Sequence, residues 1–136
     1  MLPSNLKKIR VLIVDDNLSD RMILREGLKT LGFTNIQEAE DGGIAQFKYD
    51  NAFKIGSTFE LVFIDLNMPH QNGMILLERL RTLYKAHLSY IIMITASSEE
   101  HNITDAIRKG IDDFIVKPLD IDTLRLKIES FVDKTS

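Results

Sequence analysis

The chain has 136 residues, which suits one domain with a single core, and 44% of them are hydrophobic, which argues against disorder. The net charge of −3 argues against a protein that binds nucleic acid directly, because such proteins usually carry a basic face. The absence of cysteine excludes disulfides and thiolate chemistry. No apolar run is long enough to cross a membrane, and Met1–Lys8 lacks the apolar stretch of a signal peptide, so we expect a cytoplasmic location.

Strand-like and helix-like patterns alternate along the chain. Five apolar runs that end at polar residues predict strands at Ile9–Val14, Asn35–Ala39, Phe59–Asp65, Tyr90–Ile94 and Asp113–Val116. Apolar residues repeated every three or four positions predict helices at 17–31, 44–51, 72–84, 97–109 and 120–132. Gly32 and Gly110 have the position of helix stops. The second strand contains Gln37 and Glu38, which indicates an edge position in a sheet.

Four of the predicted helices carry an apolar face that we expect to be buried, and the first presents Leu24, Leu28 and Leu31. The third presents Leu76, Leu77, Leu80 and Leu83, the fourth presents Ile103, Ala106 and Ile107, and the fifth presents Ile121, Leu124, Ile128 and Phe131. Ser97 and Glu100 have the spacing of a capping box at the start of the fourth helix. Because the face of the fourth helix is small, we expect this helix to pack lightly.

The alternation of strands and helices predicts an α/β fold in which a five-stranded parallel sheet lies between two layers of helices. Right-handed crossovers bring the carboxyl ends of all strands to one edge, where ligands bind in such sheets. We assign residues 1–8 to an N-terminal extension, residues 9–133 to the domain and residues 134–136 to a C-terminal tail.

Polar side chains follow four of the five predicted strands. They are Asp15 and Asp16 after the first strand, Asp65 at the third, Thr95 at the fourth and Lys117 after the fifth, and Ala96 adds its main-chain N–H after Thr95. Asp15 and Asp16 could simply favour the positive end of the first helix. Helix capping explains neither the Lys117 ammonium nor Asp65, whose next helix starts several residues later. The set therefore predicts a site at one edge of the sheet.

The charges of this set indicate its chemistry. Neighbouring carboxylates repel each other, so a cation is needed, and three carboxylates with one Mg²⁺ and Lys117 come close to neutrality. Mg²⁺ prefers oxygen ligands and is commonly held by one or two carboxylates together with phosphate oxygen. A third carboxylate can then attack phosphorus and form an acyl phosphate. Lys117, the Thr95 hydroxyl and the Ala96 N–H can stabilise the transferred group.

Asp15-Asp16, Asp65-Leu-Asn67-Met-Pro, Thr95-Ala96-Ser97 and Lys117-Pro118, in this order, resemble the CheY-like response-regulator receiver family of two-component signalling. The match covers about Arg10 to Phe131. The resemblance implies a flavodoxin-like (βα)5 fold with strand order 2-1-3-4-5. It also implies that Asp65 accepts a phosphoryl group from a phosphohistidine on a histidine kinase or phosphotransfer protein.

The resemblance further implies a Mg²⁺ site, in which Mn²⁺ or Ca²⁺ could substitute. Asp16, Asp65 and the main-chain carbonyl of Asn67 would be ligands, with Asp15 acting directly or through water. Lys117 would pair with Asp65 and then with the phosphoryl oxygens, and the Lys117-Pro118 bond would be cis. Asn67 and Ser97 would flank the phosphoryl group and tune its lifetime.

The same resemblance implies a switch in which Thr95 turns inward and an aromatic residue, here Phe114, follows it. Members often have tyrosine at this place, so phenylalanine removes any contact that requires the hydroxyl. Phe114 could equally be an ordinary core aromatic residue. The output would be a signalling interaction and not enzymatic turnover: a downstream partner would bind through residues 98–133, and a homodimer is a second form that the output could take.

Three other functions fit parts of the pattern. A Mg²⁺-dependent phosphatase that also forms an aspartyl phosphate would have a second aspartate two residues after a nucleophile on the first strand, but residue 17 is Asn. A dinucleotide or flavin binder would need a glycine-rich turn after the first strand, where two acids stand instead. An inactive receiver scaffold would lack some of the charged positions, all of which are present here.

Overall fold

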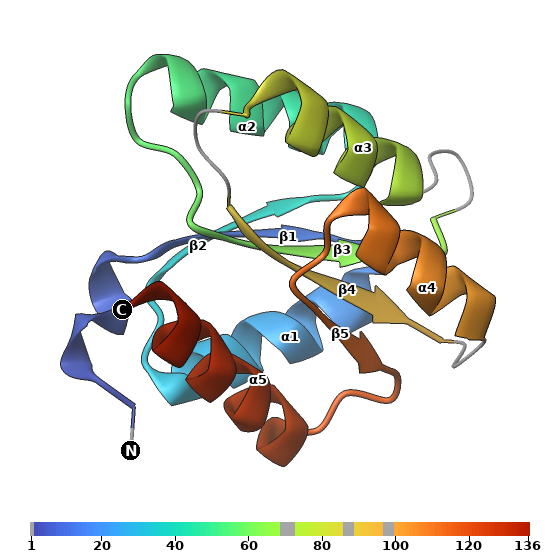
Figure 1. Cartoon of the computed structure of the whole chain (residues 1–136). Coiled ribbons are helices and arrows are strands. Elements are labelled where there is room, and N and C mark those ends of the chain that lie inside the picture. The colour runs from blue at the N-terminus through green and yellow to red at the C-terminus, as the bar shows by residue number, and fades with distance from the viewer. Residues whose placement is uncertain (1, 69–72, 86–88, 97–99) are drawn as a thin grey trace.

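The computed structural model describes the chain except residues 1, 69–72, 86–88 and 97–99 (Figure 1). Five strands form one parallel sheet: β1 (Arg10–Val14), β2 (Asn35–Ala39), β3 (Leu61–Asp65), β4 (Tyr90–Thr95) and β5 (Asp113–Val116). The helices are η1 (Ser4–Lys8, a 3-10 helix), α1 (Leu18–Leu31), α2 (Gly42–Lys54), α3 (Gly73–Leu83), α4 (Glu100–Lys109) and α5 (Ile121–Thr135). The strand order β2-β1-β3-β4-β5 confirms the predicted fold and the edge position of β2.

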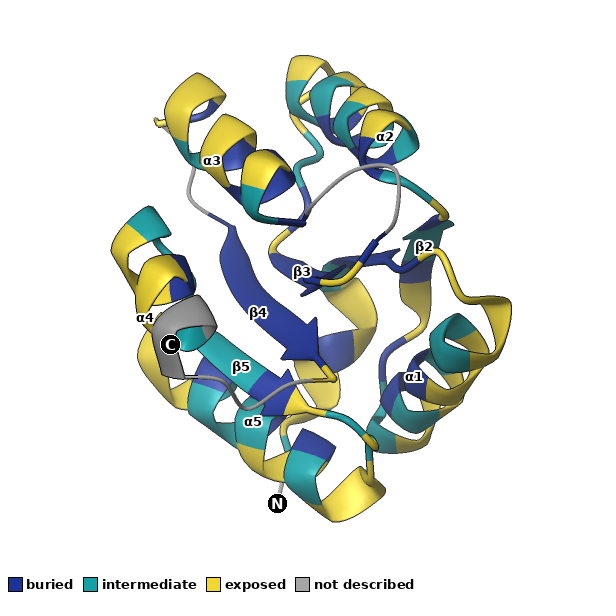
Figure 2. Ribbon diagram, turned by 90° about the vertical axis from the view of Figure 1, so that its right-hand side faces the viewer, coloured by how far each residue is buried: buried dark blue, intermediate teal, exposed yellow. Residues whose placement is uncertain are grey.

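Two hydrophobic cores lie on opposite faces of the sheet. One face packs against α1, α5 and η1, with Leu24, Leu28 and Leu124 among its buried residues. The other packs against α2, α3 and α4, with Tyr49 and Leu77 in its core. Figure 2 shows the inner strand β4 buried, the edge strand β5 partly of intermediate burial, and helices whose outer sides are exposed. The segment before the first strand contributes to this packing, because Leu6 of η1 is almost fully buried.

Local signals explain where several helices begin and end. Asn17 caps α1 by accepting a hydrogen bond from the Asp20 N–H at 2.9 Å, and Gly32 ends it with a φ of 117°. The second helix begins at Gly42 and not at the expected Ile44, because the Asp41 side chain caps it through the Ile44 N–H at 2.7 Å. It also runs past the expected end to Lys54.

The expected apolar faces are partly wrong. Leu83 and Ile107 are more than half exposed, and Ile121, the first residue of α5, is exposed as well. In α3 the buried stripe continues from Leu80 to Tyr84, four residues on, so that Leu83 points outward. The predicted cap at Ser97 lies outside the described residues. No helix in the described parts of the chain is long and apolar enough to cross a membrane.

Candidate functional site

The register of the sheet brings the ends of four strands into line. Val14 of β1 lies beside Ile64 of β3, so the next residues, Asp15 and Asp65, are neighbours. Backbone hydrogen bonds continue the ladder past the strand ends, from the Asp15 N–H to the Ala39 carbonyl at 3.1 Å and from the Lys117 N–H to the Thr95 carbonyl at 2.8 Å. Main-chain hydrogen bonds therefore fix the backbone of Asp15 and Lys117 independently of any side-chain contact.

Alternation along the strands then sets the direction of the side chains. Ile13, Phe63 and Ile115 each precede one of the charged residues by two positions: Asp15, Asp65 and Lys117, respectively. All three apolar residues belong to the core beneath α1 and α5. Since side chains two apart on a strand share a face, the three charged groups lie on the α1 side of the sheet. Their meeting follows from the register of β1, β3 and β5.

Three carboxylates form a compact cluster at this edge. One ligand oxygen from each of Asp15, Asp16 and Asp65 lies within 4.8 Å of the others. Asp15 and Asp65 are each only 4% exposed, whereas Asp16 is exposed at the mouth of the site. The backbone N–H two residues later orients each buried acid, from Asn17 to Asp15 Oδ1 at 2.9 Å and from Asn67 to Asp65 Oδ1 at 3.0 Å. The oxygens left over face the cluster.

Lys117 joins this cluster to the first turn of α1. Its Nζ lies 3.4 Å from Asp15 Oδ2 and 3.4 Å from Asp65 Oδ2, and 2.8 Å from Asp20 Oδ2. A hollow of about 380 Å³ opens beside the lysine between Ile23 of α1 and Pro118 and Leu119 after β5. The Lys117-Pro118 peptide bond is cis, as predicted.

The electrostatics indicate excess negative charge. Burial raises the pKa of Asp15 to about 6; the Asn17 N–H bond works against this, and the neighbouring Asp65 charge adds to it. Burial tends to lower the pKa of Lys117, but its hydrogen bond to Asp20 and the surrounding carboxylate charges outweigh burial and raise the pKa above its usual range. Hard oxygen donors with unbalanced negative charge fit a hard divalent cation such as Mg²⁺.

The predicted switch residues lie on the other face of the sheet. Thr95 is 2% exposed at the end of β4, and Phe114 of β5 is half-buried against the core on the α4 side. Lys127 of α5 places its Nζ 5.2 Å from the Phe114 ring centroid and 2.8 Å from Asp113 Oδ1. Ala96 and Asn67 are exposed beside the carboxylates, and Ser97 lies outside the described residues.

Comparison with known proteins decides the family. The family model of the response regulator receiver domain matches residues 11–129. This chain belongs to the response regulator receiver family. The receiver is 35% identical over 128 residues to the chemotaxis protein CheY-3 of Vibrio cholerae, and the match covers 94% of this chain and 95% of that protein.

Solved structures agree with this assignment. The CheY of the CheX–CheY–BeF3–Mg²⁺ complex from Borrelia burgdorferi has a TM-score of 0.81 and 33% identity, with 90% of this chain and 87% of that chain covered. The response regulator TrrA of Thermotoga maritima, in complex with Mg²⁺ and BeF, has a TM-score of 0.74 and 28% identity, with 90% and 98% covered. The receiver is therefore a CheY-type module of two-component signalling.

Two residues, Asp20 and Gly73, lie at the site but are not among the residues that the sequence pattern predicts there. Asp20 was not linked to the strand ends, although its place three residues after the cap of α1 puts it on the turn that faces them. A Cβ on Gly73 would overlap the main-chain oxygen of Asp65, so α3 starts in direct contact with the backbone of β3. The glycine eight residues after Asp65 was the available signal for this contact.

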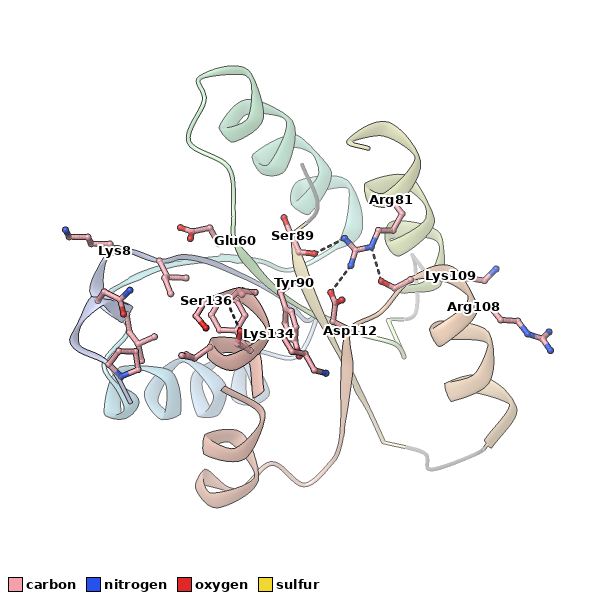
Figure 3. A pocket seen from close by; sticks show the side chains of 18 residues that line it. Lys8, Glu60, Arg81, Ser89, Tyr90, Arg108, Lys109, Asp112, Lys134 and Ser136 are labelled. Atoms are coloured by element: carbon pink, nitrogen blue, oxygen red, sulfur yellow. Dashed lines mark hydrogen bonds and ion pairs between the residues drawn. The ribbon is translucent and has the colours of Figure 1, made fainter. Parts of the chain in front are cut away.

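A larger hollow, of about 1020 Å³, lies at the opposite edge of the receiver, between η1, the start of β4 and the end of α5 (Figure 3). Its central arginine has a structural role: Arg81 donates to the carbonyls of Ser89 and Gly110 and pairs with Asp112. The Tyr90 hydroxyl at this edge is fully covered and has no hydrogen-bond partner among the described residues.

Proposed function

We propose that Asp65 accepts a phosphoryl group from a phosphohistidine on a histidine kinase or phosphotransfer protein. The observation that carries this proposal is the position of the Asp65 carboxylate, within 4.8 Å of Asp15 and Asp16 oxygens and 3.4 Å from the Lys117 ammonium. This combination allows a nucleophile, a cation site and a fixed positive charge to act on one phosphoryl group.

Asp15, Asp16, Asp65 and the main-chain carbonyl of Asn67 are the proposed ligands of Mg²⁺, which Mn²⁺ or Ca²⁺ could replace. The bound ion would neutralise charge on the transferred phosphoryl oxygens. The support is the fit of the donor set to a hard cation, together with the Mg²⁺ and BeF3 named for the Borrelia burgdorferi complex.

In the transfer step, an Asp65 carboxylate oxygen forms a bond to phosphorus while the phosphorus–nitrogen bond of the phosphohistidine breaks. The electron pair of that bond returns to the imidazole, and the product is an acyl phosphate on Asp65. Lys117, the Thr95 hydroxyl and the Ala96 N–H would donate to the phosphoryl oxygens. Asn67 and Ser97 would flank the group and influence the access of water to it.

The proposed output runs through the face formed by residues 98–133. Thr95 and Phe114 lie on the same side of neighbouring strands, and β4 and β5 pair with Met93 opposite Phe114 and Thr95 opposite Val116. Movement of Thr95 toward a phosphoryl group would leave space that Phe114 can enter, which would change the surface between α4 and α5. A downstream protein would bind this surface, and homodimerisation remains a further prediction.

The test is labelling with acetyl phosphate in Mg²⁺, followed by intact-mass measurement. We expect one added phosphoryl group, lost in Asp65→Asn and in EDTA. Asp122→Asn is a matched control, because Asp122 is an exposed first-turn aspartate of α5 that forms no ion pair with Lys117 among the described residues. Label that persists in Asp65→Asn would contradict the assignment of the acceptor. Steady turnover of a small phosphate ester would favour a phosphatase instead.

A further inference from the structure

We infer that Asp20 is a positioning residue, which draws the Lys117 ammonium toward α1 and so limits how far the lysine neutralises the carboxylates of the metal site. This inference rests on the proposed function of Asp65. It starts from a comparison of distances: Lys117 Nζ is 2.8 Å from Asp20 but 3.4 Å from Asp65. The shortest ion pair of the site lysine is therefore made outside the carboxylate cluster.

Both partners of this pair are fixed by main-chain contacts. The Asp20 N–H donates to the Asn17 side chain at 2.9 Å, so the cap of α1 holds the backbone of Asp20. The Lys117 N–H donates to the Thr95 carbonyl at 2.8 Å, which anchors the base of the lysine to β4. The side chains of Asp20 and Lys117 are 38% and 22% exposed, so solvent only partly screens the pair. Asp20 therefore acts on the lysine from a fixed position.

The ion pair between Asp20 and Lys117 affects the net charge that the site offers to a divalent cation. Three carboxylates and Lys117 alone would leave a net charge of −2 for a divalent cation to neutralise. With Asp20 included, the net charge is −3, and the ammonium is drawn toward the side of α1. If Asp20 were neutral, Lys117 would be free to move closer to Asp15 and Asp65, where it would compete with the cation for the same oxygens.

Phosphorylation of Asp65 would weaken the preference of the Lys117 ammonium for Asp20. The phosphoryl group on Asp65 brings new anionic oxygens to the side of Lys117 that faces the cluster, and these oxygens compete with Asp20 for the ammonium. Release of Asp20 would then accompany the pairing of Lys117 with the phosphoryl group. Asp20 thus keeps the lysine within reach of the nucleophile while limiting how far the lysine neutralises it beforehand.

The test compares Mg²⁺ binding by calorimetry, without phosphodonor, in the full chain and in Asp20→Asn, Asp20→Glu and the control Asp122→Asn. We expect Asp20→Asn to weaken Mg²⁺ affinity roughly five-fold, since one unit charge is lost and the ammonium moves inward. Asp20→Glu should stay within about two-fold of the parent because its carboxylate can still reach Lys117, and the control should not change. Equal affinity in Asp20→Asn and the parent would overturn the inference.

A double-mutant cycle separates positioning of Lys117 from the simple field of one more carboxylate. In a Lys117→Met background, Asp20→Asn should change Mg²⁺ affinity by less than about two-fold, because no ammonium is left to move. The same five-fold loss in both backgrounds would show a field effect alone and would overturn the inference. Spectra of the lysine ammonium groups in EDTA give a readout independent of metal: one resonance, absent in Lys117→Met, should shift in Asp20→Asn.

These measurements distinguish the inference from the proposed function. An Asp65 that is never labelled would contradict the proposed function, while the ammonium spectra would still report whether Asp20 holds Lys117. Normal labelling of the parent together with an unshifted Lys117 resonance in Asp20→Asn would overturn the inference and leave the acceptor assignment intact.

Discussion

Replacing Asp15 by Asn is expected to stabilise the metal-free receiver at neutral pH. The Asp15 carboxylate is 4% exposed and lies beside the Asp65 charge, and its pKa is raised from 3.8 to about 6. A shift of about two pKa units corresponds to roughly 3 kcal/mol between the two protonation states. Asn keeps an oxygen that can accept from the Asn17 N–H, so the substitution removes the charge and preserves the local turn.

The sign of the pH dependence follows from the direction of the shift. Because the pKa of Asp15 is higher in the folded chain than in the unfolded chain, ionisation of Asp15 favours unfolding. This cost is absent well below pH 3.8, where both states are protonated, and is complete above about pH 6. The gain from Asp15→Asn should therefore be about 3 kcal/mol at pH 7.5 and about 1 kcal/mol at pH 4.5.

Urea unfolding in EDTA at these two pH values, monitored by circular dichroism, measures the effect. Mg²⁺ should reduce the difference in stability between variant and parent. At ten times its Kd, Mg²⁺ adds about 1.4 kcal/mol to the free energy of unfolding of the parent, and it should add less to that of the variant, which lacks one proposed ligand. Asp122→Asn serves as the control for loss of one charge. An Asp15→Asn protein that is less stable than the parent at pH 7.5, or a gain independent of pH, would refute the reasoning.

Three further predictions concern residues around the site and the cores. Gly73→Ala should lower the free energy of unfolding by about 2 kcal/mol in urea and slow the labelling of Asp65, because the new Cβ would overlap the Asp65 main-chain oxygen; a silent substitution would contradict this contact. Tyr90→Phe should leave stability unchanged or raise it by about 1 kcal/mol in the same assay, since the covered hydroxyl has no partner among the described residues, and a clear loss would show that it has one. Asp41→Ala should cost about 1 kcal/mol through loss of the α2 cap, and equal thermal melting of variant and parent would count against that cap.

Much of the receiver could be predicted from its sequence. The strands are short apolar runs that end at polar residues, and right-handed crossovers between parallel strands already placed Asp15, Asp65 and Lys117 at one edge. The left-handed stop at Gly32 also agrees with its sequence signal, and the cis bond at Lys117-Pro118 agrees with what the family resemblance implies. The strand ends and the helix stop depend on one residue and its near neighbours, and that information is local in the chain.

Other features depend on how separate segments pack, which no local pattern contains. The periodicity of α3 could not tell whether Leu83 or Tyr84 faces the core, because that depends on the rotation of the helix against the sheet. The pairing of Asp20 with Lys117 joins residues that are 97 positions apart and depends on the place of α1 beside the end of β5. Sequence alone therefore determined which chemical groups reach the edge of the sheet. Tertiary structure decided which of them touch, because distances between elements are set by packing and not by spacing along the chain.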